Sequence, residues 1–317
     1  MYFKDEDFLL FSGLGGSLGI AVNKHFNYLS SSLGFRSSDC NLLDKISTID
    51  FFDKVRKNNK GKNVTYIHIA AVSGGSHLSD KIPATLFVEN MEMAINSLEA
   101  CRISNINRVI LVLSTACYSS KLDNPSESDL HKYPIETSEF GYSYAKRMLE
   151  VLMRAYNKQY KMNISCVLVN GIIGSGMKFD PSISILPAAL IQKFIDNKSN
   201  ESVIELWGDG KPIREYTSSK DLASALDWCL RNQEPNTLLN IGNTNKISVK
   251  ELSFLIADLI GIDKNRIKFN GSQTSGKSIQ ATNNCNFVER SNFQYESIEI
   301  SIKDAIRTYL NLEKNYK

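Results

Sequence analysis

The chain carries the stretch FLLFSGLGGSLG at residues 8–19, where an apolar run leads directly into closely spaced glycines. The apolar residues 8–12 predict a buried strand, and residues 17–26 predict the helix after it. Glycine lets the backbone turn tightly and approach a pyrophosphate, whose charge then lies at the helix N-terminus. This turn therefore predicts a dinucleotide-binding loop made by Gly13, Gly16, Ser17, Leu18 and Gly19. A tight turn that binds no ligand is the alternative interpretation.

Short apolar runs alternate with helical patterns through the rest of the first half. Strands are predicted at 64–70, 108–114 and 164–169, and helices at 87–104 and 141–161. This alternation predicts an α/β fold, a Rossmann-type doubly wound parallel sheet covered by helices on both faces. After residue 170 the pattern is irregular, apart from helical patterns at 220–231, 248–260 and 302–312.

The change of pattern near residue 170 predicts two domains, in keeping with a length of 317 residues. Residues 1–170, with a contribution from about 215–245, are expected to form the NAD(P)-binding domain. Residues 171–317 are expected to form mainly a smaller C-terminal α/β domain that binds the substrate.

The composition is that of an ordinary globular protein, with 42% hydrophobic and 22% charged residues. Lys plus Arg (37) exceed Asp plus Glu (34) by only three, which argues against nucleic acid or a membrane as partner. The N-terminal residues are acidic where a secretory signal is basic, so we expect a cytoplasmic protein. The six cysteines are scattered without a CxxC pair, so no metal site is expected.

The residues after the next strand bear on the choice of cofactor. A carboxylate there would bind the ribose 2′-hydroxyl of NAD, whereas an arginine favours the 2′-phosphate of NADP. The sequence at this place is Phe35-Arg36-Ser37-Ser38-Asp39. Arg36 with two serines therefore favours NADP(H), and Asp39 keeps NAD(H) as the alternative.

A serine, a tyrosine and a lysine form the candidate catalytic set. Tyr142 and Lys146 are four residues apart at the start of a predicted helix, so they share one face. A lysine beside a tyrosine stabilises the phenolate, which makes the pair usable for acid/base chemistry. Ser114 ends an apolar strand and could orient a substrate oxygen. In a second YxxxK pair, Tyr216 and Lys220, the tyrosine is expected to lie in a polar loop beyond the sheet, and the pair is interpreted as the entry to a helix.

Several motifs together resemble the extended short-chain dehydrogenase/reductases, the NAD-dependent epimerase/dehydratase family. They are the glycine turn, Asn41-Leu-Leu-Asp44, Ala70-Ala71-Val-Ser-Gly74-Gly75, Ser114-Thr-Ala-Cys-Tyr118 and the Tyr142/Lys146 pair. Within this family, Asn170 and the segments 187–194 and 207–216 resemble those of the GDP-L-fucose synthases.

The resemblance implies an enzyme that reduces the C4 ketone of a GDP-4-keto-6-deoxy sugar with NADPH. Ser114 would polarise the C4 oxygen, Tyr142 would donate its proton, and Lys146 would tune the phenol and hold the nicotinamide ribose. By the same resemblance, Asp44, Ala70 and Ala71 would contact the cofactor, and the nucleotide-sugar would be bound by Asn170, Lys193, Trp207 and Arg214. Members of this family usually dimerise through the two long helices, so we expect a homodimer.

The chain departs from the resemblance where those synthases epimerise C3 and C5 of the sugar. Ala116 occupies the position of their catalytic cysteine, and Ser184 that of their histidine. Cys117 and His77 are the nearby candidates to replace them. Gly15 stands where the family has an arginine for the 2′-phosphate. We therefore expect a reductase without epimerisation; the alternatives are a nucleotide-sugar 4-epimerase with tightly bound NAD, or a non-catalytic nucleotide-sensing protein on the same fold.

Overall fold

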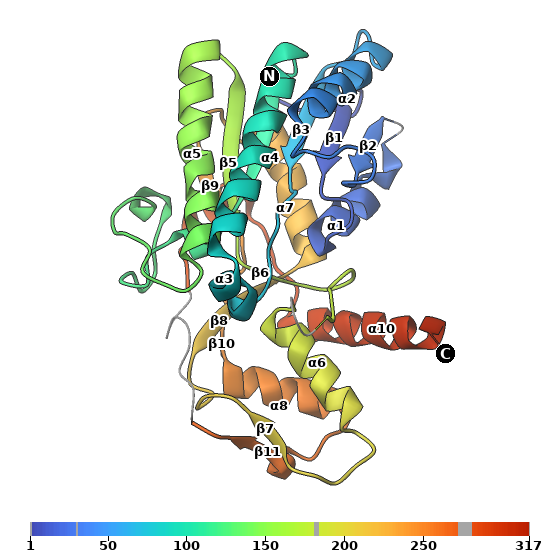
Figure 1. Ribbon diagram of the computed structural model, residues 1–317, viewed down its shortest axis with the longest axis vertical. Coiled ribbons are helices and arrows are strands. Elements are labelled where there is room, and N and C mark those ends of the chain that lie inside the picture. Colours follow the sequence, from blue (N-terminus) through green and yellow to red (C-terminus); the bar gives the residue numbers. More distant parts are fainter. Residues whose placement is uncertain (1, 30, 181–183, 272–280, 317) are drawn as a thin grey trace.

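The computed structural model describes residues 2–29, 31–180, 184–271 and 281–316, with backbone alone for 76, 77 and 313–316. Its largest element is a six-stranded sheet in the order β2-β1-β3-β4-β5-β9, with every neighbouring pair parallel. The strands are β1 Phe8–Ser12, β2 Ser32–Phe35, β3 Val64–His68, β4 Arg108–Ser114, β5 Asn163–Val169 and β9 Leu238–Asn240. The predicted α/β fold with a doubly wound parallel sheet is confirmed (Figure 1).

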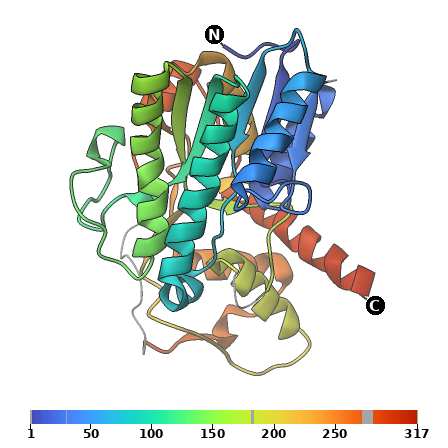
Figure 2. The same ribbon diagram turned by 45° about the horizontal axis from the view of Figure 1, so that its top comes forward.

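Helices cover both faces of this sheet because side chains alternate along each buried strand. Leu10 and Tyr66 pack on one face, and their neighbours Leu9 and Ile67 pack on the other. The first face carries three helices side by side, as Figure 2 shows: α2 Lys45–Asn58, α4 Pro83–Ile103 and α5 Phe140–Tyr160. The second face carries α1 Ser17–His25 and α7 Ser219–Asn232, with α9 Cys285–Ser291 beside β9.

A smaller lobe lies beyond the carboxyl ends of the strands, in the lower half of Figure 1. It contains a mixed three-stranded sheet of β6 Gly171–Ile173, β8 Ile213–Ser218 and β10 Lys246–Ser248, and a pair formed by β7 Ile204–Leu206 and β11 Ile267–Phe269. Its helices are α6 Leu186–Asp196, α8 Val249–Ile260 and α10 Ile298–Tyr316, which share one apolar core. A short helix, α3 Ser76–Lys81, precedes α4.

Four helices of this structure are absent from the sequence-based expectations: α2, α3, α6 and α9. In α2 the mean hydropathy is low and only Thr48, Phe52 and Val55 are buried, so its apolar periodicity is weak. In α6 the helix follows an irregular stretch and has proline in its first turn, a position that a helix tolerates because no backbone donor is needed there. None of the helices in the described ranges is long and apolar enough to cross a membrane.

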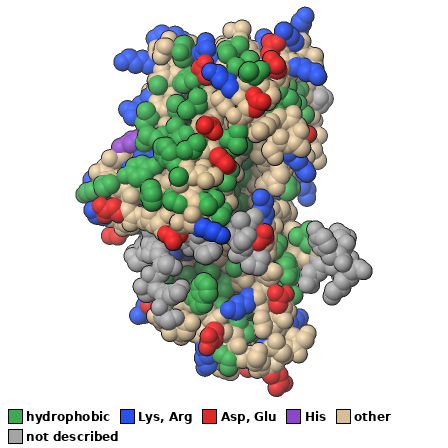
Figure 3. All heavy atoms as spheres, in the orientation of Figure 1, with side chains coloured by type: hydrophobic (Ala, Val, Ile, Leu, Met, Phe, Trp, Pro, Cys, Tyr) green, Lys and Arg blue, Asp and Glu red, His purple; other side chains and the backbone are tan. Residues whose placement is uncertain are grey.

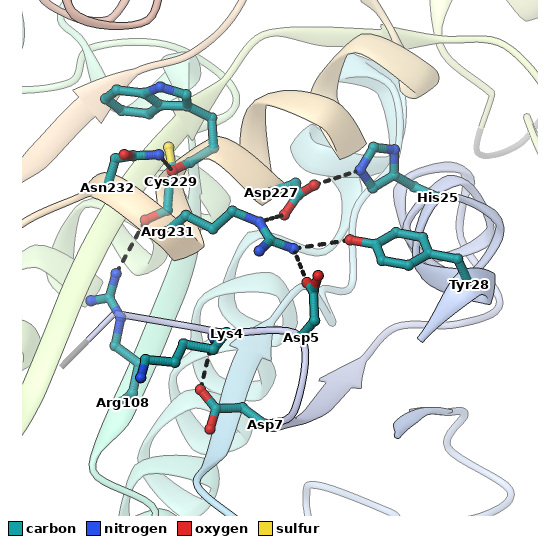
Figure 4. Close-up of polar contacts among 11 residues, drawn as sticks. Lys4, Asp5, Asp7, His25, Tyr28, Arg108, Asp227, Cys229, Arg231 and Asn232 are labelled. Carbon is teal, nitrogen blue, oxygen red and sulfur yellow. Dashed lines mark hydrogen bonds and ion pairs between the residues drawn. The ribbon is translucent and has the colours of Figure 1, made fainter. Parts of the chain in front are cut away.

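The N-terminal segment is fastened to the sheet domain at the end away from the smaller lobe (Figure 4). Phe3 is buried, and its backbone N–H donates to the Leu230 carbonyl at 3.1 Å. The Arg231 guanidinium of α7 lies over the Phe3 ring and bonds Asp227 at 2.6 Å and Asp5 at 2.8 Å. This network ties the first residues to α7 far from the cleft described below.

Candidate active site

A cleft of about 1560 Å³ opens between the carboxyl ends of the large sheet and the smaller lobe. It is lined by the glycine turn, by the segments that follow β2, β3 and β4, by the start of α5, and by residues of the smaller lobe. A typical pocket for a single small ligand measures roughly 300–1,000 Å³. The cleft therefore has room for a dinucleotide and a second ligand.

The glycine turn closes tightly over the first strand. Gly13 has a φ of +80°, which favours glycine, and a Cβ there would lie 3.0 Å from the Ala70 backbone nitrogen. Gly16 is the N-cap of α1 and donates its N–H to the Gly13 carbonyl at 3.0 Å. A Cβ on Gly19 would lie 2.1 Å from that same carbonyl oxygen. The first turn of α1 thus lies directly against the loop, and its free N–H groups line the cleft, which is the arrangement that a pyrophosphate needs.

Ser12, at the end of β1, holds the segment beside the glycine turn through its side-chain hydroxyl. The sequence analysis did not select this residue. Its hydroxyl oxygen accepts hydrogen bonds from the N–H groups of Ile69 and Ala70, each at 3.1 Å, and from the Tyr66 hydroxyl at 3.0 Å. These bonds hold the end of β3 beside the end of β1. A single polar residue in the run 8–12 was the available signal. Ala70 and Ala71 line the cleft at this place.

The predicted cofactor-binding residues after β2 separate into two groups. Arg36, Ser37 and Ser38 line the cleft. The Asp39 carboxylate turns back and accepts from the Arg36 backbone N–H at 2.8 Å. Asp44 lies outside the cleft lining and caps α2, accepting from the N–H groups of residues 46 and 47. Its role in cofactor binding stays a prediction, while its helix cap is an observed contact.

Ser114, Tyr142 and Lys146 meet on the wall of the cleft. Ser114 ends β4, and its hydroxyl oxygen accepts from the Ala116 backbone N–H at 3.2 Å. Tyr142 and Lys146 share a face of α5, and a hydrogen bond joins Ser114 to the Tyr142 phenol. The Lys146 ammonium donates to the Val112 carbonyl at 3.1 Å, which fastens α5 to β4. Sequence reasoning therefore selected three side chains that the fold brings together.

Burial controls the ionisation of these groups. It lowers the pKa of Lys146 to about 8, and it raises the pKa of the Tyr142 phenol although the bond from Ser114 acts in the opposite direction. His68, at the end of β3, has a pKa lowered to about 3 by burial and by the nearby Lys146 charge. Its ring Nδ1 lies 3.0 Å from the Tyr66 hydroxyl. The site therefore holds a neutral phenol next to an amine that titrates near neutrality.

The predicted substrate-binding residues differ in their exposure and in their hydrogen bonds. Trp207 lies on the rim with a relative exposure of 76%, and Arg214 also lines the cleft. Asn170 is almost fully buried; its amide donates to the Asn243 carbonyl at 2.7 Å and accepts from Thr217 at 2.5 Å. These bonds join the large sheet to the smaller lobe, so the amide has little capacity left for a ligand.

Lys193 is the predicted residue that the structure leaves apart. It is exposed on α6, outside the cleft lining, and its ammonium donates to the Glu205 carbonyl of β7. Three residues that the sequence analysis did not select do line the cleft: Glu139, Lys178 and Tyr216. Tyr216 lies on strand β8 rather than in a polar loop, so that expectation was wrong; Lys220 does stand in the first turn of α7.

The positions associated with epimerisation carry no acid or base. Ala116 and Ser184 line the cleft, and the buried Ser184 hydroxyl has no hydrogen-bond partner among the residues that the structure describes. Cys117 is fully buried in the core beneath α5 and is not part of the cleft lining. The side chain of His77 lies outside the described residues.

Comparisons with known proteins identify the family and relatives of this chain. The family model described as "NAD dependent epimerase/dehydratase family" matches residues 23–242. GDP-L-fucose synthase of Dictyostelium discoideum is 28% identical over 312 residues, covering 96% of this chain and 95% of that protein. GDP-L-colitose synthase of Yersinia pseudotuberculosis is 27% identical over 321 residues, covering 97% and 99% of the two chains. Among solved structures, a GDP-L-fucose synthetase from Naegleria fowleri bound to NADP superposes with a TM-score of 0.86 at 24% identity, covering 99% and 97%.

Proposed function

This chain belongs to the NAD-dependent epimerase/dehydratase family, and from that premise we propose that it is an NADP(H)-dependent reductase of a nucleotide-linked 4-keto sugar. The substrate we propose is a GDP-4-keto-6-deoxy sugar, and the reaction is reduction at C4 without epimerisation. Two relatives whose names refer to GDP-linked sugars are 27–28% identical to this chain over nearly its full length. Their names support GDP as the nucleotide of the substrate.

The observation that carries the proposal is a complete set for carbonyl reduction beside an incomplete set for epimerisation. Ser114, Tyr142 and Lys146 line one wall of the cleft. Moving a proton at carbon next to a ketone needs a base and an acid close to the sugar ring. The methyl group of Ala116 and the hydroxyl of Ser184 cannot serve as such groups near neutral pH.

The reaction itself is simple in its requirements. A reduced nicotinamide bound in the cleft would supply the hydride for C4 of the sugar. The Ser114 hydroxyl donates a hydrogen bond to the C4 oxygen, and the Tyr142 phenol transfers its proton to that oxygen as the C–H bond forms. Lys146, when protonated, stabilises the phenolate that remains. Ketone, hydride and proton together give the alcohol, so the step balances without any further group.

The contacts after β2 support NADP(H) over NAD(H). An acid that binds the ribose 2′-hydroxyl must present its carboxylate to the cleft. The Asp39 carboxylate is instead engaged by the Arg36 backbone N–H, while the Arg36 side chain and two serines line the cleft. A guanidinium with two hydroxyls suits a 2′-phosphate.

The test is a mixing experiment with purified protein, NADPH and freshly prepared GDP-4-keto-6-deoxymannose. Loss of the reduced nicotinamide is followed by absorbance, and the product is identified by NMR. We expect NADPH consumption with a 6-deoxymannose or 6-deoxytalose product. A fucose product would refute the absence of epimerisation.

A failure to consume NADPH would remove this substrate, and two simple observations then separate the alternatives. NAD that survives purification in stoichiometric amount would favour a 4-epimerase. A Tyr142→Phe variant with unchanged biological activity would favour a non-catalytic nucleotide-sensing protein.

Helices α4 and α5 support the expectation of a homodimer. Hydrophobic side chains gather on the face of the molecule over these helices, as Figure 3 shows. Phe87 and Val88 of α4 and Phe140 and Val151 of α5 are each exposed by 38–48%, and the first three border a shallow apolar hollow. We propose that a second copy of the chain covers this face. Sedimentation should give a dimer for the wild type and a monomer for Val88→Glu; a monomeric wild type would refute the proposal.

A further inference from the structure

Arg147 is a buried cation without an acidic partner among the described residues. It follows Lys146 on α5, and its relative exposure is 4%. The guanidinium donates instead to two backbone carbonyls, that of Cys117 through Nε at 2.9 Å and through Nη2, and that of Tyr133 through Nη1 at 2.9 Å. Burial lowers its pKa, because a charge removed from water costs free energy. The contacts of this buried guanidinium should therefore explain why a charged side chain stands here.

The first contact lies beside the catalytic serine. Residues 115–117 form a single 3₁₀ turn that Ser114 caps with its hydroxyl oxygen. Cys117 is the last residue of this turn, so a bond to its carbonyl fixes the position of the turn. Lys146 fastens the carbonyl of Val112, two residues before Ser114, and Arg147 fastens the carbonyl of Cys117, three residues after it. Two consecutive cations of one helix thus hold the backbone on both sides of Ser114.

The second contact controls the far end of the same connection. Between β4 and α5 the chain makes a long excursion, residues 115–139, which contains no strand and only two short 3₁₀ turns. Its last residues, 137–139, line the cleft just before Tyr142. Arg147 binds the Tyr133 carbonyl, and one helical turn earlier the Tyr144 hydroxyl accepts from the Ile135 N–H at 3.1 Å. The guanidinium therefore links the beginning and the end of this excursion to α5.

We propose that Arg147 is a positioning residue for the reductase step: it fixes the Ser114 turn and the 133–139 segment against the helix that carries Tyr142 and Lys146. The inference rests on the proposed function for its kinetic consequence, but not for its structural one. A guanidinium suits the role because its planar donors can bind two carbonyls in fixed directions, which an ammonium cannot do.

The experiment compares wild type, Arg147→Met, Arg147→Lys and the control Arg154→Met. Arg154 lies on the same helix but is exposed and bonds only the side chain of Glu150 among the described contacts. Hydrogen–deuterium exchange of the folded protein with bound NADPH is measured by mass spectrometry. We expect exchange of peptides covering 115–122 and 130–138 to rise about tenfold or more in Arg147→Met, which is the scale for losing a charged hydrogen bond. The Arg147→Lys variant should lie between, and Arg154→Met should match the wild type.

The kinetic readout is taken per NADPH-binding site, so that a loss of folded protein does not count as a loss of rate. For Arg147→Met we expect kcat to fall about 100-fold, the scale for a misplacement of about 1 Å, with the KM for the nucleotide-sugar within threefold. The deuterium isotope effect from 4-deuterated NADPH should rise as hydride transfer becomes rate-limiting. Arg147→Lys should recover part of the rate.

The outcomes separate the two proposals. The role of Arg147 would be overturned if both peptides of Arg147→Met exchanged at the wild-type rate. It would also be overturned if kcat per site and the isotope effect were unchanged in this variant. If the wild type itself consumes no NADPH with any 4-keto sugar offered, the proposed function fails, and the exchange of the two peptides decides about Arg147. Should Arg147→Met not fold, the same comparison of exchange and rate is made with Arg147→Lys.

Discussion

Replacement of Gly19 by alanine tests the geometry of the nucleotide-binding turn. A Cβ at this position would lie 2.1 Å from the Gly13 carbonyl oxygen and 2.9 Å from the Leu14 Cα, both of them backbone atoms. Contacts of a Cβ below 3.0 Å are essentially never observed. The turn must therefore move away from α1 by about 0.9 Å, which is the 3.0 Å limit minus the 2.1 Å distance to the Gly13 oxygen. No flexible side chain is available to absorb this shift.

The expected magnitudes follow from that displacement. Overpacking of this kind costs about 1–3 kcal/mol of stability, and alanine in place of glycine within a helix returns about 1 kcal/mol, so the net destabilisation is roughly 0–2 kcal/mol. Binding should suffer more, because the N–H groups of the turn are then misaligned with the pyrophosphate. Loss of one charge-assisted hydrogen bond, about 1.5–3 kcal/mol, corresponds to about 10- to 150-fold weaker binding.

The assay is a fluorescence titration with NADPH, accompanied by chemical denaturation. Gly15→Ala is the matched control, because it lies in the same turn and a Cβ there meets nothing within 4 Å. We expect Gly15→Ala to bind NADPH within about threefold of the wild type, and Gly19→Ala to bind at least about tenfold more weakly. Equal affinities for the two variants would refute the reasoning, because the close approach of α1 to the turn would then have no consequence for the cofactor.

Further predictions concern the catalytic groups and a buried carboxyl. Tyr142→Phe should lower kcat by about 10²- to 10⁴-fold while NADPH binding stays within threefold, as judged by the same titration; a smaller loss would exclude the phenol as the proton donor. Since Lys146 has a pKa of about 8 and acts in its protonated form, kcat should fall as pH rises through about 8, and a profile flat from pH 7 to 9.5 would contradict this role. Glu215 is buried on β8 and accepts from the Thr282 N–H at 3.1 Å and hydroxyl at 2.9 Å, and burial raises its pKa from 4.5 to about 7. The folded state therefore holds this proton more tightly than the unfolded state, and wild-type stability should fall between pH 4.5 and 7. Glu215→Gln removes that fall, so its unfolding free energy relative to the wild type should rise by about 2–3 kcal/mol from pH 5 to pH 8; parallel pH profiles in urea denaturation would contradict the assignment.

The sequence alone indicated a parallel sheet, the glycine turn and the grouping of Ser114, Tyr142 and Lys146, because these depend on local patterns; the catalytic role of the three residues stays a prediction. Buried strands are apolar without interruption, and the first strand leads directly into glycines, so its place in a parallel sheet is recognisable. Tyr142 and Lys146 are four residues apart on one helix, and Ser114 ends a strand of the same sheet. Departures at Ala116 and Ser184 were also visible from the sequence, and the structure places both on the cleft wall.

Only the tertiary structure decided which polar side chains remain free for a ligand. Asn170 is committed to the backbone and hydroxyl of the smaller lobe, Lys193 to a carbonyl of β7, and Arg147 to carbonyls 30 and 14 residues away in the chain. Tyr216 enters the cleft because β8 pairs with β6, which no local pattern indicates. The physical reason is the same in each case: a buried polar group must find a partner, and that partner is a backbone group brought near by folding rather than by position in the sequence.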